Sequence, residues 1–122
     1  VERPRTNTPL QALVTLNDPQ FTEAARNLAQ RMVKEGGQTA PERVTYGYRL
    51  VAARQPKPIV TNILVAAYNE ELENFKKNTE AADKLIAVGE SKRDATINNA
   101  EHAAWTIVAS MLLNLDEVIT RL

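Results

Sequence analysis

A line of four polar residues in the last quarter of the sequence has the types and the spacing to do chemistry. His102, Thr106, Ser110 and Asn114 follow one another at intervals of four residues, so on a helix they share one face. An imidazole, two hydroxyls and an amide on one line could contact a polar ligand. In the alternative, structural interpretation, the Thr and Ser hydroxyls bond back to the preceding helical turn, while His and Asn meet neighbours or water. We expect the structural interpretation.

Aromatic side chains could supply a binding platform. Trp105 could stack on a sugar ring, but the residues around it on its helix are apolar, which indicates a place in the core. These neighbours are Ala104, Val108, Ala109 and Leu112. Tyr46 and Tyr48 could line a groove, although two tyrosines alone do not specify one.

The residue types needed for metal binding or catalysis are scarce. The sequence has one histidine, His102, and no cysteine, so a zinc or haem site lacks ligands. Glu70, Glu71 and Glu73 stand close together, but without oxygen ligands at loop spacing they predict a solvated charged face. No glycine-rich phosphate loop, GxSxG elbow or HExxH motif occurs. We therefore expect no catalytic residue, no metal and no cofactor.

Helical periodicity, together with start and stop signals, predicts six helices and no strand in this sequence. The helices are expected over residues of about 8–16, 19–35, 40–53, 58–78, 81–88 and 98–115. The breaks between them contain Pro or Gly, or a polar loop, so the connections are expected to be short or moderate in length.

Local capping signals set the expected helix boundaries. A Thr or Asp followed by Pro in the first turn is typical of a helix start, and a Gln or Glu three residues after the cap completes a capping box. Starts of this kind stand at Thr8-Pro9-Leu10-Gln11, Asp18-Pro19 and Thr39-Ala40-Pro41-Glu42. Thr79 is expected to cap the short helix over 81–88. Gly36-Gly37 and Gly89 are expected to end helices.

Apolar stripes at helical spacing predict which side of each helix is buried. The stripe of the second helix is Phe21, Ala24, Ala25, Leu28, Ala29, Met32 and Val33. The stripe of the third is Val44, Tyr48, Val51 and Ala52, and that of the fourth is Val60, Ile63, Leu64, Ala67, Tyr68, Leu72 and Phe75. The helix from about Asn98 is apolar nearly all round, which is typical of the middle of a bundle. The sequence therefore predicts a compact all-α bundle organised around this last helix.

Charge is balanced overall and divided between the two halves of the sequence. Residues 1–57 hold nine Lys/Arg and five Asp/Glu, and residues 58–122 hold six and ten, so the halves carry +4 and −4. A balanced chain has no net field to attract nucleic acid, and we expect no nucleic-acid partner. The basic residues of the first half look dispersed along helices: Arg26, Arg31, Lys34, Arg43, Arg49 and Arg54. We expect the two oppositely charged halves to pack on each other.

Length and the start of the sequence bear on domain organisation. A chain of 122 residues is long enough for one core, and we expect residues 1–122 to form a single helical domain. The beginning, VERPRTNTP, has no initiator Met and is typical of extended chain, which indicates a fragment of a larger multidomain protein. No apolar run reaches the roughly 18–20 residues that span a bilayer, so we expect no membrane insertion by this fragment.

Two blocks of the sequence are similar to a known family. They are RTNTPLQALVTLNDP at 5–19 and AEHAAWTIVASMLLNLDEVITR at 100–121. Together with LIAVGES at 85–91, they resemble the C-terminal domain of unknown function in large planctomycete-type exported proteins, which often carry cytochrome-c-like modules. His102 stands where that family would have an apolar residue, and Asn98-Asn99 replaces a start of the Asp-Pro type.

The resemblance has limited implications for function. It implies export of the parent protein to the periplasm or cell envelope, and haem modules elsewhere in that protein. It carries over no catalytic residue, because none is established for the domain.

The leading functional hypothesis is a non-catalytic helical interaction or scaffolding module that docks to other domains of its parent chain or to a protein partner. One alternative is an accessory domain that completes an enzyme or electron-transfer complex whose reactive groups lie elsewhere. Another is a small-ligand or glycan-binding module that uses aromatic side chains and the polar line of residues 102–114. The first helix stands at the cut end of the chain, so we expect an apolar patch near residues 9–17 through which the fragment self-associates.

Overall fold

The structure, a computed structural model, describes residues 18–89 and 92–114. Within these ranges it contains five helices and no strand, which confirms the predicted all-α class. The helices are α2 (Pro19–Glu35), α3 (Ala40–Ala52), α4 (Pro58–Lys77), α5 (Thr79–Ile86) and α6 (Asn99–Leu113). The helix expected over residues 8–16, with its apolar patch near 9–17, lies outside the described residues. The described helices therefore number five instead of the six expected.

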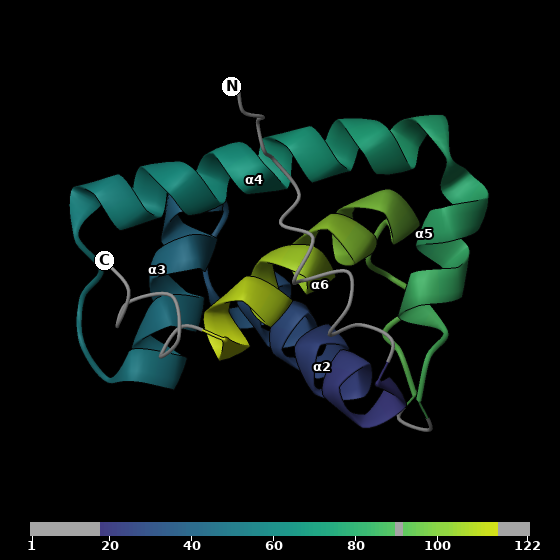
Figure 1. Cartoon of the computed structure of the whole chain (residues 1–122), viewed down its shortest axis with the longest axis horizontal. Helices are drawn as coiled ribbons and strands as arrows, with labels where there is room; N and C mark the ends of the chain where they lie inside the picture. The colour runs from purple at the N-terminus through teal and green to yellow at the C-terminus, as the bar shows by residue number, and fades with distance from the viewer. Residues whose placement is uncertain (1–17, 90–91, 115–122) are drawn as a thin grey trace, which may run out of the picture.

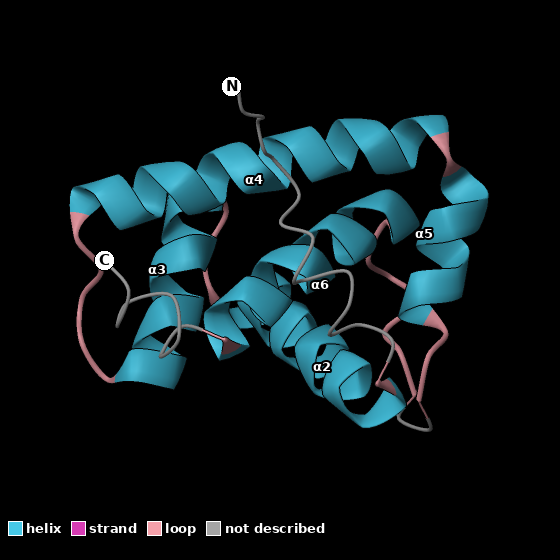
Figure 2. Cartoon of the chain, viewed as in Figure 1, coloured by secondary structure: helices cyan, strands magenta, loops and turns pink. Residues whose placement is uncertain are grey.

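The helices form a compact bundle in which α4 runs along one edge (Figures 1 and 2). Helix α6 lies between α4 and α2, while α3 and α5 stand at opposite ends of α4. Helix α6 packs extensively against α2, α4 and α5 and touches α3 over a smaller area. Among the described helices, α2, α4 and α5 therefore supply most of the packing around α6, while α3 packs mainly on α2 and α4.

The predicted capping signals act as expected at α2 and α3. The Asp18 carboxylate accepts a hydrogen bond from the Gln20 N–H at 2.9 Å. At α3, the Thr39 hydroxyl accepts from the Glu42 N–H at 3.3 Å, and the Glu42 carboxylate accepts from the Thr39 N–H at 3.1 Å. This reciprocal pair satisfies two backbone donors that a helix start leaves without partners.

The boundaries of α5 differ from the expected ones. The structure places the N-cap at Asn78, whose side-chain oxygen accepts from the Ala81 N–H at 3.2 Å, and begins the helix at Thr79. The helix ends at Ile86. Asn78 also ends α4, so one residue serves both helices and leaves no room for a separate cap at Thr79.

The main core gathers where α2, α3, α4 and α6 meet. Trp105 of α6 has no exposed surface, as predicted, and its ring stacks on Tyr68 of α4 with centroids 4.0 Å apart. Gly47 allows the close approach of three helices, because a Cβ atom there would lie 2.7 Å from the Met32 Sδ and 2.8 Å from the Leu112 Cδ1. The absence of a side chain at Gly47 is therefore part of the packing.

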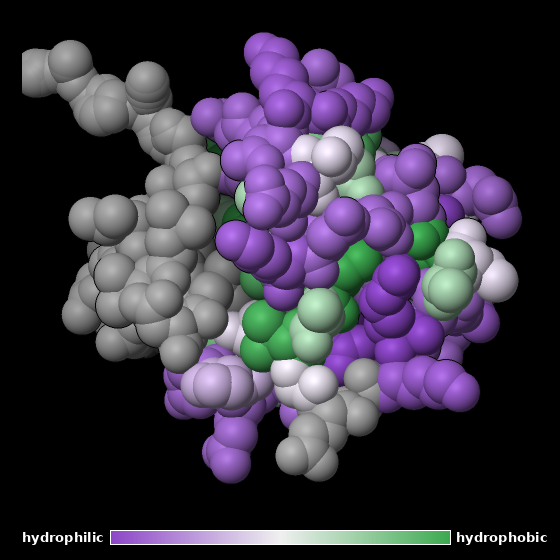
Figure 3. All heavy atoms as spheres, turned by 90° about the vertical axis from the view of Figure 1, so that its right-hand side faces the viewer, coloured by the Kyte–Doolittle hydropathy of each residue, from purple (hydrophilic) through white to green (hydrophobic). Residues whose placement is uncertain are grey.

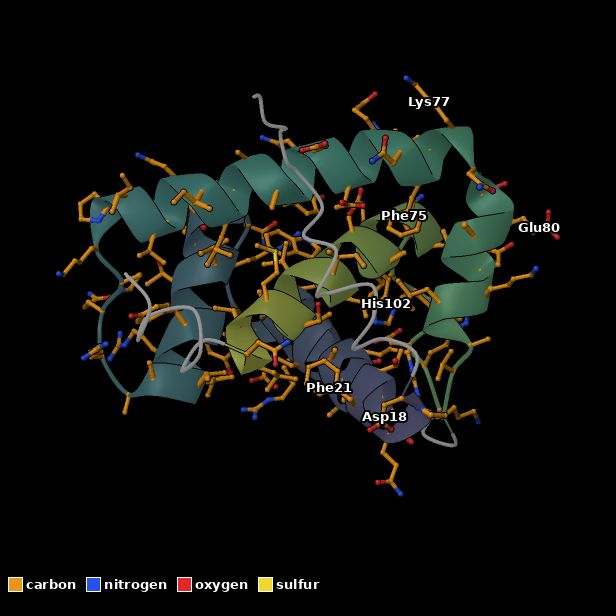
Figure 4. All side chains as sticks on the ribbon, viewed as in Figure 1. Asp18, Phe21, Phe75, Lys77, Glu80 and His102 are labelled. Atoms are coloured by element: carbon orange, nitrogen blue, oxygen red, sulfur yellow. The ribbon has the colours of Figure 1, made fainter. Side chains whose placement is uncertain are left out.

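A second, smaller core lies toward α5. It contains Ala82, Ile86 and Ala103, and Phe75 points inward from α4 to contact both cores (Figure 4). On the face of the molecule that α5 forms, hydrophilic atoms predominate and hydrophobic atoms show as a band between them (Figure 3). This end of the molecule has the ordinary surface of a packed bundle.

Three predicted buried positions are wrong. Val51 and Ile63 are 38% and 56% exposed, and Ala24 is exposed as well. The apolar stripes of α3 and α4 are wider than the area that neighbouring helices cover, so their margins face solvent. Periodicity identifies the centre of a buried face, but the width of that face depends on which helix packs there.

Candidate functional site

The polar line predicted from sequence lies on α6 and its hydroxyls bond backward along the helix. Thr106 donates from its Oγ1 to the His102 carbonyl oxygen at 2.7 Å, and Ser110 donates to the Ile107 carbonyl oxygen at 2.6 Å. Asn114 donates from its side-chain amide to the Ser110 carbonyl oxygen at 3.2 Å. The structural interpretation of Thr106 and Ser110 is thus confirmed. Contact of the line with a ligand stays a prediction.

His102 connects α6 to α2. Its ring is fully buried, and Nε2 donates to the Arg26 carbonyl oxygen at 3.2 Å. Burial lowers the pKa of His102 below its usual value of 6.5, so the ring is neutral at pH 7. The other nitrogen, Nδ1, is buried and accepts no hydrogen bond from the residues that the structure describes. In Figure 4 the side chain lies between α6 and α2. This geometry is typical of a packing contact between α6 and α2.

The three glutamates of α4 do not all behave as predicted. Glu70 and Glu73 are exposed, in keeping with a solvated face, but Glu71 is only 5% exposed. Its Oε2 has no hydrogen-bond partner among the described residues. Glu71 stands three and seven residues after Tyr68 and Leu64, which are buried, so it continues their stripe. Burial raises the pKa of Glu71, and the neighbouring Glu70 carboxylate raises it further.

The described residues form a groove along the outer side of α3, with a volume of about 970 Å³. We call it the α3 groove. Its lining residues are Glu35, Gly36, Gly37, Pro41, Glu42, Thr45, Tyr46, Arg49, Leu50, Ala53, Arg54 and Gln55. Of the two tyrosines that could line a groove, Tyr46 does so, while Tyr48 is 3% exposed and belongs to the main core.

Both carboxylates of the α3 groove are bound within the molecule. Glu35 accepts a hydrogen bond from the Tyr46 hydroxyl and forms an ion pair with Arg31 at 3.2 Å. These two contacts, the Tyr46 hydrogen bond first, lower the pKa of Glu35. Glu42 accepts from the backbone N–H groups of Gln38 at 2.9 Å and Thr39 at 3.1 Å, which lower its pKa in that order. Each carboxylate is therefore already balanced by local donors.

The cations of the α3 groove are not balanced in this way. Arg49 and Arg54 line it, and neither guanidinium forms an ion pair or a side-chain hydrogen bond with the residues described. Leu50, beside them, is 42% exposed. The groove thus offers a bulky apolar side chain next to two uncompensated positive charges.

The combination of an exposed leucine with two arginines that are unpaired among the described residues was not predicted from the sequence. Arg49 and Arg54 looked dispersed along helices, but the fold brings both to one groove. A signal was present: residues 42, 45, 46, 49 and 53 follow one helical stripe, and all but the last of them carry a polar group. The sequence does not reveal that this stripe is left uncovered by the helices of residues 18–89 and 92–114.

Two further properties of the described residues concern metal ions and membranes. No group of three or more His, Cys, Asp or Glu side chains is arranged to hold a metal ion within the described part of the chain. Among the described helices, none combines the length and the hydropathy that a membrane crossing needs.

Comparison with known families gives one match. A family model described as PSD1, protein of unknown function (DUF1553), matches residues 1–68, which is more than half of the chain. No curated protein and no solved structure matches the sequence. The matched residues include α2, α3, the whole α3 groove and the first half of α4.

Proposed function

We propose that this chain, which belongs to the PSD1 family of proteins of unknown function (DUF1553), is a non-catalytic helical module that docks to other domains of its parent protein. The observation that carries the proposal is a set of four exposed, bulky apolar side chains on either side of the α3–α4 connection. They are Leu50, Val51, Ile59 and Ile63, with exposed fractions of 42%, 38%, 65% and 56%. We call them the exposed apolar set.

The placement of this set supports docking. Leu50 and Val51 lie in the last turn of α3, and Ile59 and Ile63 lie four residues apart on the first turns of α4. The last turn of α3 and the first turns of α4 lie at the end of the molecule opposite α5 (Figure 1). Burial of such a side chain from full exposure contributes about 1.5–3 kcal/mol. These four are already partly covered, so each adds roughly half of that, and a partner that covers several of them gains affinity.

The chain's wider context is also part of this proposal. Resemblance of residues 5–19 and 100–121 to a C-terminal domain of planctomycete-type exported proteins supports a parent that works in the periplasm or cell envelope. The same resemblance supports cytochrome-c-like modules as neighbours. A docking module beside haem modules would complete an electron-transfer assembly without holding the reactive group itself, and this is the second candidate function.

Differential thiol labelling of the full parent protein tests the docking proposal. The chain contains no cysteine, so Ile63→Cys introduces a single labelled position within it. If another domain covers this face, a maleimide reacts with Ile63→Cys several-fold more slowly than with Glu80→Cys. Peptide mass spectrometry measures both rates.

The matched control is chosen from the other end of the molecule. Glu80 is exposed on α5 and points away from the bundle in Figure 4. Equal labelling rates at the two positions in the intact parent protein would show that nothing covers the exposed apolar set, and the docking proposal would then be wrong.

A further inference from the structure

The α3 groove has a shape suited to a segment of polypeptide. Its lining runs along one side of α3 from Glu42 to Ala53, which at the rise of an α-helix is a length of roughly 16 Å. That length equals about five residues of extended chain. A groove of this length that stays open along one side accepts a linear segment more readily than a compact small molecule.

The charges left available in the groove are positive. Glu35 and Glu42 are engaged by Arg31, Tyr46 and backbone N–H groups, as described above. Arg49 and Arg54 have no such partners among the described residues. A segment that enters the groove therefore meets two guanidinium groups, which pair with carboxylates through a planar fork of donors.

The apolar part of the groove adjoins these cations. Leu50 follows Arg49 directly and is 42% exposed, and Ala53 lies one residue before Arg54. The ring of Tyr46 is held in place by its hydroxyl contact with Glu35. An occupant that matches this pattern carries an apolar side chain over Leu50 and acidic side chains on either side of it.

From this pattern we infer that the α3 groove binds an acidic segment with an apolar anchor, contributed by another domain of the parent protein. The inference rests on the proposed docking function and names the chemistry of the partner. Two carboxylates pair with Arg49 and Arg54, and the anchor covers Leu50. Because exposed ion pairs contribute little by themselves, the anchor supplies affinity and the carboxylates fix the register.

Carbodiimide cross-linking of the full parent protein tests this inference. The variant Arg54→Lys places an amine in the groove, and the reagent joins an amine to a carboxylate only where the two are in contact. We expect a cross-link from position 54 to an Asp or Glu outside residues 1–122, identified by mass spectrometry. The yield should exceed that from native Lys77 by about tenfold, because docking raises the local concentration of the carboxylate.

Lys77 is the control because it is exposed at the other end of α4, points away from the bundle in Figure 4 and does not line the groove. A second variant, Leu50→Ser in the Arg54→Lys background, should remove most of the cross-link by removing the anchor contact. A cross-link to a carboxylate of a second copy of this chain would overturn the inference in favour of self-association. No enrichment at position 54 over Lys77 would overturn it as well.

Failure of this inference about the α3 groove can be distinguished from failure of the docking proposal. If Ile63→Cys is protected in the parent protein but position 54 forms no cross-link, another domain docks and the assignment of the α3 groove is wrong. If Ile63→Cys is unprotected and position 54 forms no cross-link, docking itself is wrong.

Discussion

Helix α6 and the outer side of α3 differ in where their side chains find partners. From Ala100 to Ser110, every residue of α6 except Glu101 is buried, and its hydroxyls and imidazole bond to backbone carbonyls within the bundle. On the outer side of α3, Leu50 and two arginines face solvent without partners among the described residues. Polar side chains in a core can thus have a structural role, whereas exposed side chains without partners are the stronger indication of a binding surface.

The largest effect that tests this contrast is expected at the centre of α6. Trp105→Ala removes a fully buried ring that stacks on Tyr68, and it should lower the free energy of unfolding by about 3–5 kcal/mol. Urea denaturation followed by far-UV circular dichroism measures the change. A loss below roughly 1 kcal/mol would mean that Trp105 is not a core residue and would revive its interpretation as a binding platform.

This expectation about Trp105 came from the sequence, as did the caps at Asp18 and Thr39, because each depends on residues within one or two helical turns. The exposure of Ile63 and the burial of Glu71 were not predicted from the sequence. Both depend on which helix packs against α4, and that information lies in contacts between residues distant in the sequence. The α3 groove was missed for the same reason, since whether Arg49 and Arg54 line one open groove depends on which of the described helices pack against α3.

A smaller effect is expected from protonation of His102. Its folded-state pKa is lowered by burial, so the neutral ring contributes stability that is present above the unfolded value of about 6.5 and is lost as pH falls through the folded pKa. Within that window the free energy of unfolding should fall by up to about 1.4 kcal/mol per pH unit.

Comparison with His102→Gln isolates this titration from that of the carboxylates. The amide of Gln can still donate toward the Arg26 carbonyl but does not ionise. The difference in unfolding free energy between the two proteins, measured by urea denaturation from pH 7.5 down to about pH 5, should therefore shrink as pH falls. A constant difference would show that His102 is solvated, and α6 would then not be closed to water as described.

Glu71→Gln is expected to have an effect of opposite sign. Burial raises the folded-state pKa of Glu71, so its contribution to stability is fully present below the unfolded pKa and is lost as pH rises through the folded pKa. Replacement by Gln removes this loss and should stabilise the protein by about 1 kcal/mol at pH 7–8, with little change near pH 4. Thermal unfolding at both pH values measures it, with exposed Glu73→Gln as the control. Destabilisation at pH 8 would show that the Asn74 side chain, which lowers the pKa of Glu71, outweighs the cost of burying the carboxylate.

The smallest effect on stability is expected at the exposed apolar set, and two adjacent residues of α4 make the test direct. Ile63 is 56% exposed and Leu64 is 4% exposed. Leu64→Ala should cost about 2–5 kcal/mol, because it leaves a cavity against α6. Ile63→Ala should change the free energy of unfolding by less than about 0.5 kcal/mol, while in the parent protein it should weaken the association with the domain that covers it.

Urea denaturation of both variants measures the effect on folding, and the labelling rates in the parent protein measure the effect on docking. Together the two measurements separate a core residue from a docking residue. If Ile63→Ala destabilises the chain as much as Leu64→Ala does, then Ile63 is a core residue. The exposed side chains near the α3–α4 connection would then not differ from the buried ones of α6, and Ile63 could not serve as the probe of docking.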